Sequence, residues 1–237
     1  MTISLLLTPE ELGLPEVKIE GERYRHLFRA RRQKVGDRMR VVDGRGRARW
    51  ARVMRVDRRS GYLELADEAP RNEPEVWLEL FVVPPKSQRL TWLVEKSTEI
   101  GVSAIRLIHS RRGPRSCGAG TLERLRRVAA AAVVQSQRSL IPEISGVHDW
   151  HELVALASRS ETCWTLDPDA NAVANLETSD SACLLVGPEG GWEEAERRDM
   201  KAMGCLPLAL GSRILRTETA AVVGATLLLS SSDRSGV

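Results

Sequence analysis

Apolar and polar positions alternate over short runs in the first third of the chain. Arg38 and Arg40 flank Met39, with Val41 following, which is the period of a half-buried strand. Asp43-Gly44 and Ser60-Gly61 stand where hairpin turns would fall. One stretch, residues 21–33, predicts a short helix. We therefore expect a small β-barrel or sheet domain over residues 1–72.

After residue 75 the pattern changes to apolar runs that alternate with helical periodicity. The runs predict strands at residues 76–83, 104–109, 162–166, 182–186 and 206–210. The periodic segments predict helices at residues 87–101, 121–138, 192–204 and 217–229. Thr121 is the expected N-cap of one helix, and Gly101 the expected C-cap of another. This series predicts an α/β domain with a mostly parallel sheet covered on both faces. The proline-bearing segment 69–75 is the expected boundary, which gives domains 1–72 and 73–237.

Composition narrows the class of protein. The 42% hydrophobic and 28% charged content is that of a soluble globular protein. The apolar run 220–229 is about half the length of a membrane span, and residues 1–7 lack the basic region of a signal peptide. Four cysteines, Cys117, Cys163, Cys183 and Cys205, form no metal-binding spacing. We expect them to be reduced in a cytoplasmic protein that binds neither a membrane nor a metal.

Charge is distributed unevenly between the two predicted domains. Residues 1–72 carry 17 Lys+Arg against 11 Asp+Glu, whereas residues 73–237 carry 18 against 21. Between Arg23 and Arg59 there are 15 basic residues and three acidic ones. Nearly all are arginines, whose planar fork suits phosphate and base edges. A solvated basic surface is the alternative, but a one-sided excess this dense favours a nucleic-acid-binding face.

Two strand-to-helix junctions carry the candidate chemistry: Gly187 to Gly191, "GPEGG", and Leu210 to Ala220, "LGSRILRTETA". Both should lie at the carboxyl ends of strands, where open α/β sheets bind ligands. Neither matches a phosphate-binding glycine motif, and Glu189 would repel a phosphate. Bare main chain between apolar walls suits an adenine-bearing ligand without phosphates, such as S-adenosylmethionine. For either junction alone, a tight turn before a helix is the alternative.

These two junctions resemble the SPOUT (trefoil-knot) methyltransferases. Within that superfamily the chain resembles the family that methylates uracil N3 in 16S ribosomal RNA. The similarity extends to three other segments, "HLFRARRQKVGDRMRVVDGRG", "EKSTEIGV" and "QSQRSLIPEI", in the same order. It therefore covers almost the whole chain.

The resemblance implies a PUA-like RNA-binding β-barrel over residues 1–72 and a SPOUT domain with a C-terminal trefoil knot over residues 73–237. It implies an S-adenosylmethionine-dependent enzyme, a homodimer, whose partner is 16S ribosomal RNA or the small ribosomal subunit. The implied cofactor-binding residues are Leu166, Gly187, Pro188, Glu189, Gly190, Gly191, Leu210, Gly211, Ile214, Leu215, Arg216, Thr217, Thr219 and Ala220. The implied RNA-binding residues are Arg23, Arg29, Arg32, Lys86, Arg112 and Arg138.

Methylation at uracil N3 requires loss of the N3 proton, and the resulting anion is delocalised onto O2 and O4. Arginine donors would stabilise it, and Arg138 and Arg216 are the candidate catalytic residues. Arg138 has an alternative role at a helix C-terminus, and Arg216 an alternative as the partner of Glu189 or Glu218. The general base stays unassigned. Three other functions remain open: a knotted methyltransferase acting on transfer RNA or a ribose 2′-hydroxyl, a non-catalytic RNA-binding module, and a nicotinamide or nucleotide enzyme.

Overall fold

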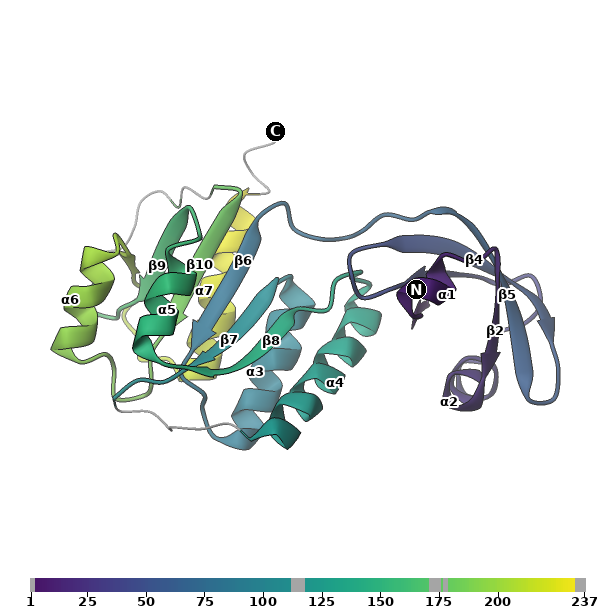
Figure 1. Cartoon of the computed structure of the whole chain (residues 1–237), viewed down its shortest axis with the longest axis horizontal. Coiled ribbons are helices and arrows are strands. Elements are labelled where there is room, and N and C mark those ends of the chain that lie inside the picture. Colours follow the sequence, from purple (N-terminus) through teal and green to yellow (C-terminus); the bar gives the residue numbers. More distant parts are fainter. Residues whose placement is uncertain (1–2, 112–117, 171–175, 177–178, 233–237) are drawn as a thin grey trace. The chain divides into compact units, whose positions relative to one another are not determined.

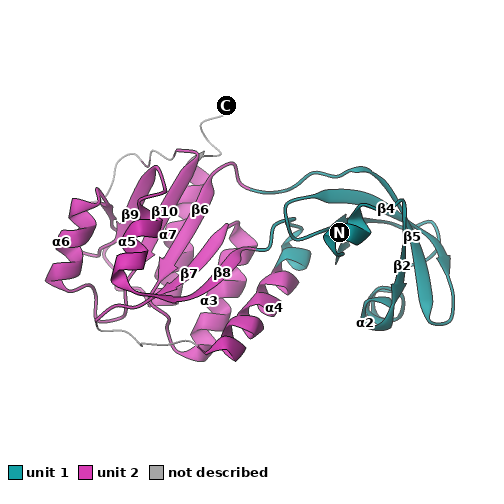
Figure 2. Ribbon diagram, viewed as in Figure 1, with its two compact units in different colours: residues 1–73, 133–141 teal, residues 74–132, 142–237 magenta. Residues whose placement is uncertain are grey.

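The computed structural model describes residues 3–111, 118–170, 176 and 179–232. The chain forms two compact units, drawn in Figures 1 and 2. The first contains residues 1–73 and 133–141, and the second contains residues 74–132 and 142–237. The predicted domain division between residues 72 and 73 remains a proposal. Among the described residues, no helix has both the length and the apolar character needed to cross a bilayer.

The first unit is built on a five-stranded sheet. In spatial order its strands are β1 (Ser4–Leu6), β3 (Arg38–Val42), β4 (Ala48–Val56), β5 (Ser60–Glu68) and β2 (Glu16–Glu20). β1 pairs with β3 in parallel, and the other neighbours are antiparallel. Two irregularities in the β4–β5 register, between Arg49 and Ala51 and between Val53 and Arg55, interrupt the ladder. Such bulges bend a sheet and increase its twist, so they help it to curl around its core.

Alternate residues of these strands form the core of the first unit. Met39, Val41, Val53 and Leu63 are fully buried within it. The predicted helix at residues 21–33 consists of α2 (Gly21–Tyr24) followed by a π-helical segment, Arg25–Ala30. β1, β2 and α1 (Pro9–Leu12), each three to five residues long, were not predicted.

The second unit has a six-stranded sheet whose paired strands are all parallel, as predicted. In spatial order the strands are β11 (Leu206–Leu208), β9 (Thr162–Leu166), β10 (Ser181–Val186), β6 (Trp77–Val82), β7 (Ala104–Ile108) and β8 (Glu143–His148). The helices of this part of the chain are α3 (Ser87–Ile100), α4 (Ala119–Ser136), α5 (Trp150–Ala157), α6 (Glu194–Ala202) and α7 (Thr217–Ser232). β8 and α5 were missed, because the segment that contains them is short and weakly periodic.

Helices cover both faces of this sheet. In Figure 1, α5 and α6 lie in front of the strands and α7 lies behind them. α7 packs against β10, β6 and α3. A Cβ at Gly224 would lie 3.1 Å from side-chain atoms of both Leu166 and Leu184, so this glycine lets α7 approach the sheet closely.

One of the two predicted helix caps is confirmed. Gly101 is the C-cap of α3, as predicted, and its φ is 113°. Thr121 is not an N-cap, because it lies inside α4, which begins at Ala119.

The prediction that all cysteines are reduced is wrong for one pair. Cys163 and Cys205 form a disulfide, with their Cα atoms 4.6 Å apart. The cause is sheet register: Trp164 pairs with Leu206, which sets the preceding residues opposite each other. Their separation of 42 residues gives no sequence signal. Cys183 is buried and unbonded, and burial raises the pKa of its thiol to about 12. Cys117 lies outside the described residues.

Candidate active site

A pocket opens at the carboxyl ends of three neighbouring strands of the second unit. The last residues of β9, β10 and β11, which are Leu166, Val186 and Leu208, all line it. The two glycine-bearing junctions follow β10 and β11 directly, so parallel strand order brings both to the same edge of the sheet. About 730 Å³ of empty space, part of it open to solvent, lies between the pocket walls.

Glycine conformation shapes both junctions. The Gly191 N–H donates to the Pro188 carbonyl at 2.9 Å, which closes a tight turn. Gly191 has φ of 69° and Gly211 has φ of 94°, in the left-handed region that favours glycine. At Gly187 a Cβ would lie 3.0 Å from the Trp192 ring. The glycines therefore permit turns and a close approach that other residues would strain.

The pocket collects most of the residues predicted to bind the cofactor. Eleven of the fourteen line it: Leu166, Gly187, Pro188, Glu189, Gly191, Leu210, Gly211, Ile214, Leu215, Thr217 and Ala220. Gly190 and Arg216 belong to the same loops but are not lining residues, and Thr219 lines a neighbouring groove. That these residues bind the cofactor stays a prediction.

Sequence reasoning missed several lining residues. Asp167, Pro168, Trp192, Arg197 and Arg213 belong to this group. Asp167-Pro168 directly follows the predicted strand 162–166 and offered a weak signal. Arg197 gave no sequence signal, because its position in the pocket depends on the ion pair that it forms, from α6, with Asp167.

The pocket residues fit an adenosyl ligand without phosphates. Most of the wall is aliphatic, aromatic or proline, and the lining contains no lysine. Of its cations, Arg197 is paired with Asp167 and Arg213 is exposed. The Nε1 atom of Trp192 is buried and has no hydrogen-bond partner among the described residues. A buried donor of this kind requires a partner, which a polar group of a ligand would supply.

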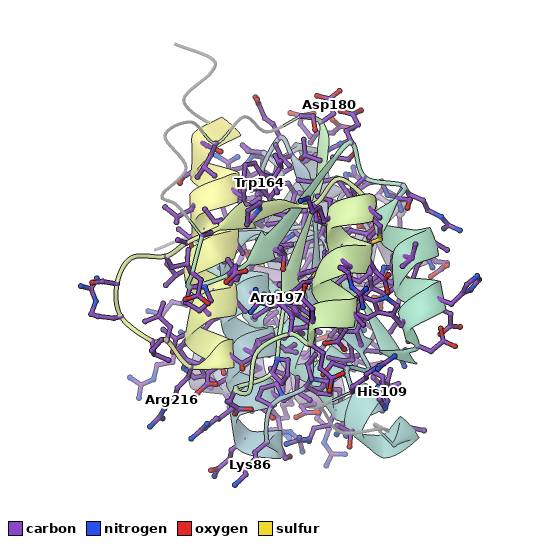
Figure 3. All side chains as sticks on the ribbon, turned by 90° about the vertical axis from the view of Figure 1, so that its left-hand side faces the viewer. Lys86, His109, Trp164, Asp180, Arg197 and Arg216 are labelled. Carbon is purple, nitrogen blue, oxygen red and sulfur yellow. A yellow bond between two sulfur atoms is a disulfide. The ribbon has the colours of Figure 1, made fainter. Side chains whose placement is uncertain are left out.

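Arg216 lies exposed in the second junction (Figure 3). In that view Arg216 and Lys86 lie towards one end of the unit, and Asp180, just before β10, lies towards the other. Among the described residues, the carboxylates of Glu189 and Glu218 pair with Arg89, at 3.6 and 3.5 Å, rather than with Arg216. The structure therefore gives no support to the alternative that Arg216 serves only as their partner.

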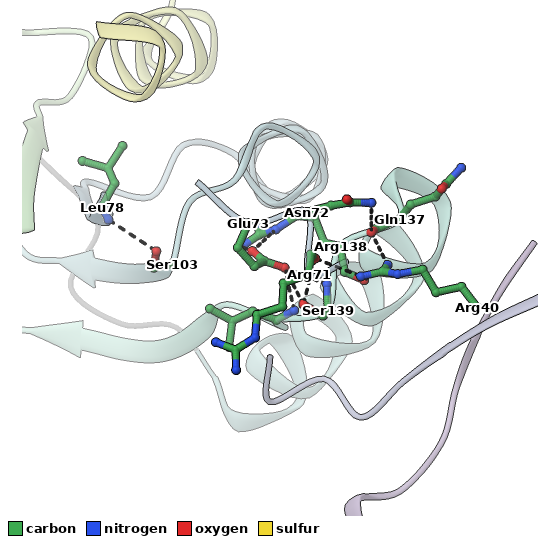
Figure 4. Close-up of polar contacts among 10 residues, drawn as sticks. Arg40, Arg71, Asn72, Glu73, Leu78, Ser103, Gln137, Arg138 and Ser139 are labelled. Atoms are coloured by element: carbon green, nitrogen blue, oxygen red, sulfur yellow. Dashed lines mark hydrogen bonds and ion pairs between the residues drawn. The ribbon is translucent and has the colours of Figure 1, made fainter. Parts of the chain in front are cut away.

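Arg138 lies in a buried polar cluster of the first unit (Figure 4). Its side chain is bound by Glu73, whose Oε2 atom accepts from Nε at 2.8 Å and from Nη2 at 2.6 Å. The other Glu73 oxygen accepts from the backbone N–H groups of Ser139 and Leu140. Arg138 is only 2% exposed. It is thus engaged in the fold, and its predicted contact with RNA requires this ion pair to open.

Arg40 completes this cluster. It is also only 2% exposed and donates to the carbonyls of Pro70, Arg71 and Gln137. We call Arg40, residues 70–73 and residues 137–140 the arginine clasp, because together they tie two distant segments of the chain.

The remaining predicted RNA-binding residues differ in their environments. Arg23 is held by Glu11 through two hydrogen bonds of 2.7 Å. Arg29 and Arg32 are exposed on the first unit, and Lys86 is exposed before α3 of the second unit. Arg112 lies outside the described residues. The described part of the chain contains no group of three or more His, Cys, Asp or Glu residues placed to hold a metal ion.

Comparison with known families identifies the two parts of the chain. Residues 72–229 match the model of the RNA methyltransferase domain, and residues 19–65 match the RNA methyltransferase PUA domain. The chain belongs to the RNA methyltransferase family. This membership confirms the predicted family, the predicted enzyme class and a PUA domain at the N-terminus.

Individual relatives agree with this assignment. The chain is 29% identical to ribosomal RNA small subunit methyltransferase E of Synechocystis sp. over 231 residues, which cover 94% of this chain and 76% of that protein. It is 25% identical to the Bacillus subtilis protein of the same name, with 87% and 86% covered. A Neisseria gonorrhoeae methyltransferase E, crystallised bound to S-adenosyl methionine, has 27% identity and a TM-score of 0.84, with 97% of this chain and 98% of that chain covered. The predicted SPOUT and PUA-like fold is thereby confirmed.

Proposed function

We propose that this RNA methyltransferase uses S-adenosylmethionine to methylate N3 of a uridine in 16S ribosomal RNA, in the cytoplasm. The observation that carries the proposal is the pocket at the ends of β9, β10 and β11, with its glycine turns and apolar wall. The relatives named above are small-subunit ribosomal RNA methyltransferases, and they supply the RNA class. The resemblance to the family that methylates uracil N3 supplies the position.

The cofactor assignment has two supports. The Neisseria gonorrhoeae protein, similar over nearly the whole chain, binds S-adenosyl methionine. The pocket lining here consists mostly of apolar side chains and glycine main chain and has no lysine, which suits an adenosyl group better than a nucleotide. When bound, this cofactor supplies an electrophilic methyl group on a sulfonium. The residues of the chain have to align that methyl group with the target atom, because direct displacement depends on alignment.

Arg216 is the candidate for stabilising the uracil anion. It is exposed within the loop that lines the pocket, so it is accessible to a substrate base. A guanidinium beside O2 or O4 favours the anion that forms when the N3 proton leaves. On the first unit, exposed Arg29 and Arg32 are the candidates for binding the RNA backbone.

A homodimer is part of the proposal. Val223 and Leu227 lie one turn apart on α7 and are 37% and 39% exposed. Two apolar side chains one turn apart on the exposed face of α7 favour a partner surface of the same chain. Analytical ultracentrifugation should give twice the 26.3 kDa mass, and Leu227→Asp should return the protein to the monomer mass.

Mass spectrometry of ribosomal RNA tests the function. A strain without this protein should lack one methyl group on a uracil base of 16S ribosomal RNA. Purified protein and S-adenosylmethionine should restore it, either on free RNA or on the small subunit, which identifies the true partner. A methyl group missing from transfer RNA or from a ribose instead would favour the alternative methyltransferases. Unchanged RNA methylation would favour a non-catalytic RNA-binding module.

A further inference from the structure

A second, shallower groove adjoins the cofactor pocket. Two elements line it: Gln88, Arg89 and Trp92 from α3, and Glu218 and Thr219 from α7. The first turn of α7 forms a wall of both sites, because Thr217 and Ala220 line the cofactor pocket. A group bound in this groove would therefore lie one helical turn from the cofactor.

Glu218 is the unexplained residue in this groove. It is only 7% exposed, and its Oε2 atom is buried without a hydrogen-bond partner among the described residues. A buried carboxylate oxygen that accepts no hydrogen bond is costly, because burial removes the water that would otherwise donate to it. The other oxygen, Oε1, lies 3.5 Å from Nε of Arg89, which is longer than a normal N–H···O hydrogen bond. Glu218 thus lacks the donor that its burial requires.

Arg89 and Trp92 complete the chemical character of the groove. Arg89 lies between Glu218 and Glu189 at 3.5 and 3.6 Å, so its guanidinium is near both carboxylates without a short hydrogen bond to either. Trp92 is 42% exposed and lies one turn after Arg89 on the same face of α3. The groove therefore offers an acceptor, a forked donor and an aromatic face.

This set of groups is complementary to the imide edge of uracil. That edge presents an N–H donor at N3 between two carbonyl acceptors, O2 and O4. A carboxylate accepts from N3–H, a guanidinium donates to a carbonyl, and an indole ring stacks on the base. Cytosine has no proton at N3, so its lone pair would face the carboxylate and be repelled. A groove with these groups would therefore distinguish uracil from cytosine.

We infer that Glu218, Arg89 and Trp92 bind the target uracil, and that Glu218 is the proton acceptor for N3. This assignment rests on the proposed function and specifies its substrate site. The N3 proton passes to the Glu218 carboxylate, and the N3 electron pair forms the new N–CH₃ bond. The electron pair of the broken S–CH₃ bond stays on sulfur, which leaves a neutral thioether. Glu218 then releases its proton to solvent, and Arg89 stabilises the charge on the carbonyl oxygen.

Glu218→Gln tests the proton transfer, since it keeps the side-chain shape and removes the carboxylate. The assay is single-turnover methylation of small subunits from a strain that lacks the protein. We expect a rate loss of about 100-fold or more, in the range of general-base removal. The affinity for S-adenosylmethionine, measured by calorimetry, should change less than about threefold. Glu95→Gln, an exposed carboxylate of α3 paired with Lys96, is the matched control and should keep the wild-type rate.

Trp92→Leu tests the stacking, with Trp77→Leu as control because Trp77 is equally exposed, at 43%. We expect KM for RNA to rise about tenfold for Trp92→Leu alone, with the dimer intact. A dimer broken by Trp92→Leu would place this residue in the subunit interface and overturn the assignment. The assignment would also be overturned if the Glu218→Gln enzyme were as fast as wild type, or if it lost only cofactor affinity or thermal stability. These results would contradict the substrate-site assignment but not the proposed function. A wild-type enzyme that is inactive on ribosomal RNA would contradict both proposals.

Discussion

Two arginines of the clasp and two arginines near the pocket have opposite surroundings. In the arginine clasp, Arg40 and Arg138 are buried, and their donors are bound by a carboxylate and several carbonyls. Near the pocket of the second unit, Arg216 is exposed, and Arg89 lies 3.5 Å or more from its carboxylate partners. The buried arginines of the clasp stabilise the fold, whereas Arg216 and Arg89 remain accessible to a substrate. Residue type alone does not make this distinction, because all four are arginines.

The largest effect is expected from breaking the clasp. Glu73→Ala would leave the buried guanidinium of Arg138 without its counter-ion and two backbone N–H groups without an acceptor. Removing one partner of a buried ion pair costs about 3–5 kcal/mol. Hydrogen exchange of the β3 and β4 amides should show that loss. Glu68→Ala, at an exposed site on β5, should show little change. Equal protection in both variants would mean that the clasp does not stabilise the first unit.

The next effect concerns the glycine turn that closes at Gly191. Gly191→Val places a β-branched residue at φ of 69°, which strains the turn that shapes the pocket. We expect a loss of about 100-fold in S-adenosylmethionine affinity by calorimetry, or about 2.7 kcal/mol. Gly204→Val is matched in backbone strain, with φ of 79°, but lies after α6 and outside the pocket lining. Its affinity should stay near wild type, and a similar loss in both variants would refute a local role.

Arg216→Ala tests whether an exposed arginine near the pocket serves catalysis and not folding. The side chain is exposed, so the melting temperature should barely move, with less than about 0.5 kcal/mol lost. The methylation rate should fall about 10- to 100-fold if its donor stabilises the uracil anion. Arg198→Ala on α6 also removes an exposed arginine and should leave the rate unchanged. A destabilised but fully active Arg216→Ala protein would reverse the assignment.

The smallest effect is a pH dependence in the first unit. The hydrogen bond from Arg23 holds the pKa of Glu11 below its usual value. A depressed pKa in the folded state adds stability above the unfolded value, near 4.3, and that stability is lost as pH falls through the folded value. Glu11→Gln should cost about 0.5–1 kcal/mol at pH 7, and this cost should disappear as pH falls through the folded pKa of Glu11. Glu16→Gln, exposed on β2, is the control, and an equal pH profile would show that the pair is not stabilising.

Sequence patterns predicted what depends on neighbours along the chain. The parallel sheet and most of its strands follow from apolar runs, and the two loops that line the pocket follow from glycines beside strand ends. Long-range partners were not predictable. Glu73 and Arg138 are 65 residues apart, and no local pattern reports that they meet. The Cys163–Cys205 bond depends on the pairing of two strands that the sequence predicts but does not place side by side.

Residues 133–141 belong to the first unit although they follow 59 residues of the second, 74–132. Val133 packs with Val42, Ala48 and Ala69, and Arg138 holds Glu73. An N-terminal fragment cut at residue 73 would therefore lack part of its own interior. An exchange of residues 1–73 between related proteins would likewise separate this unit from residues 133–141, so the two segments have to remain compatible with each other.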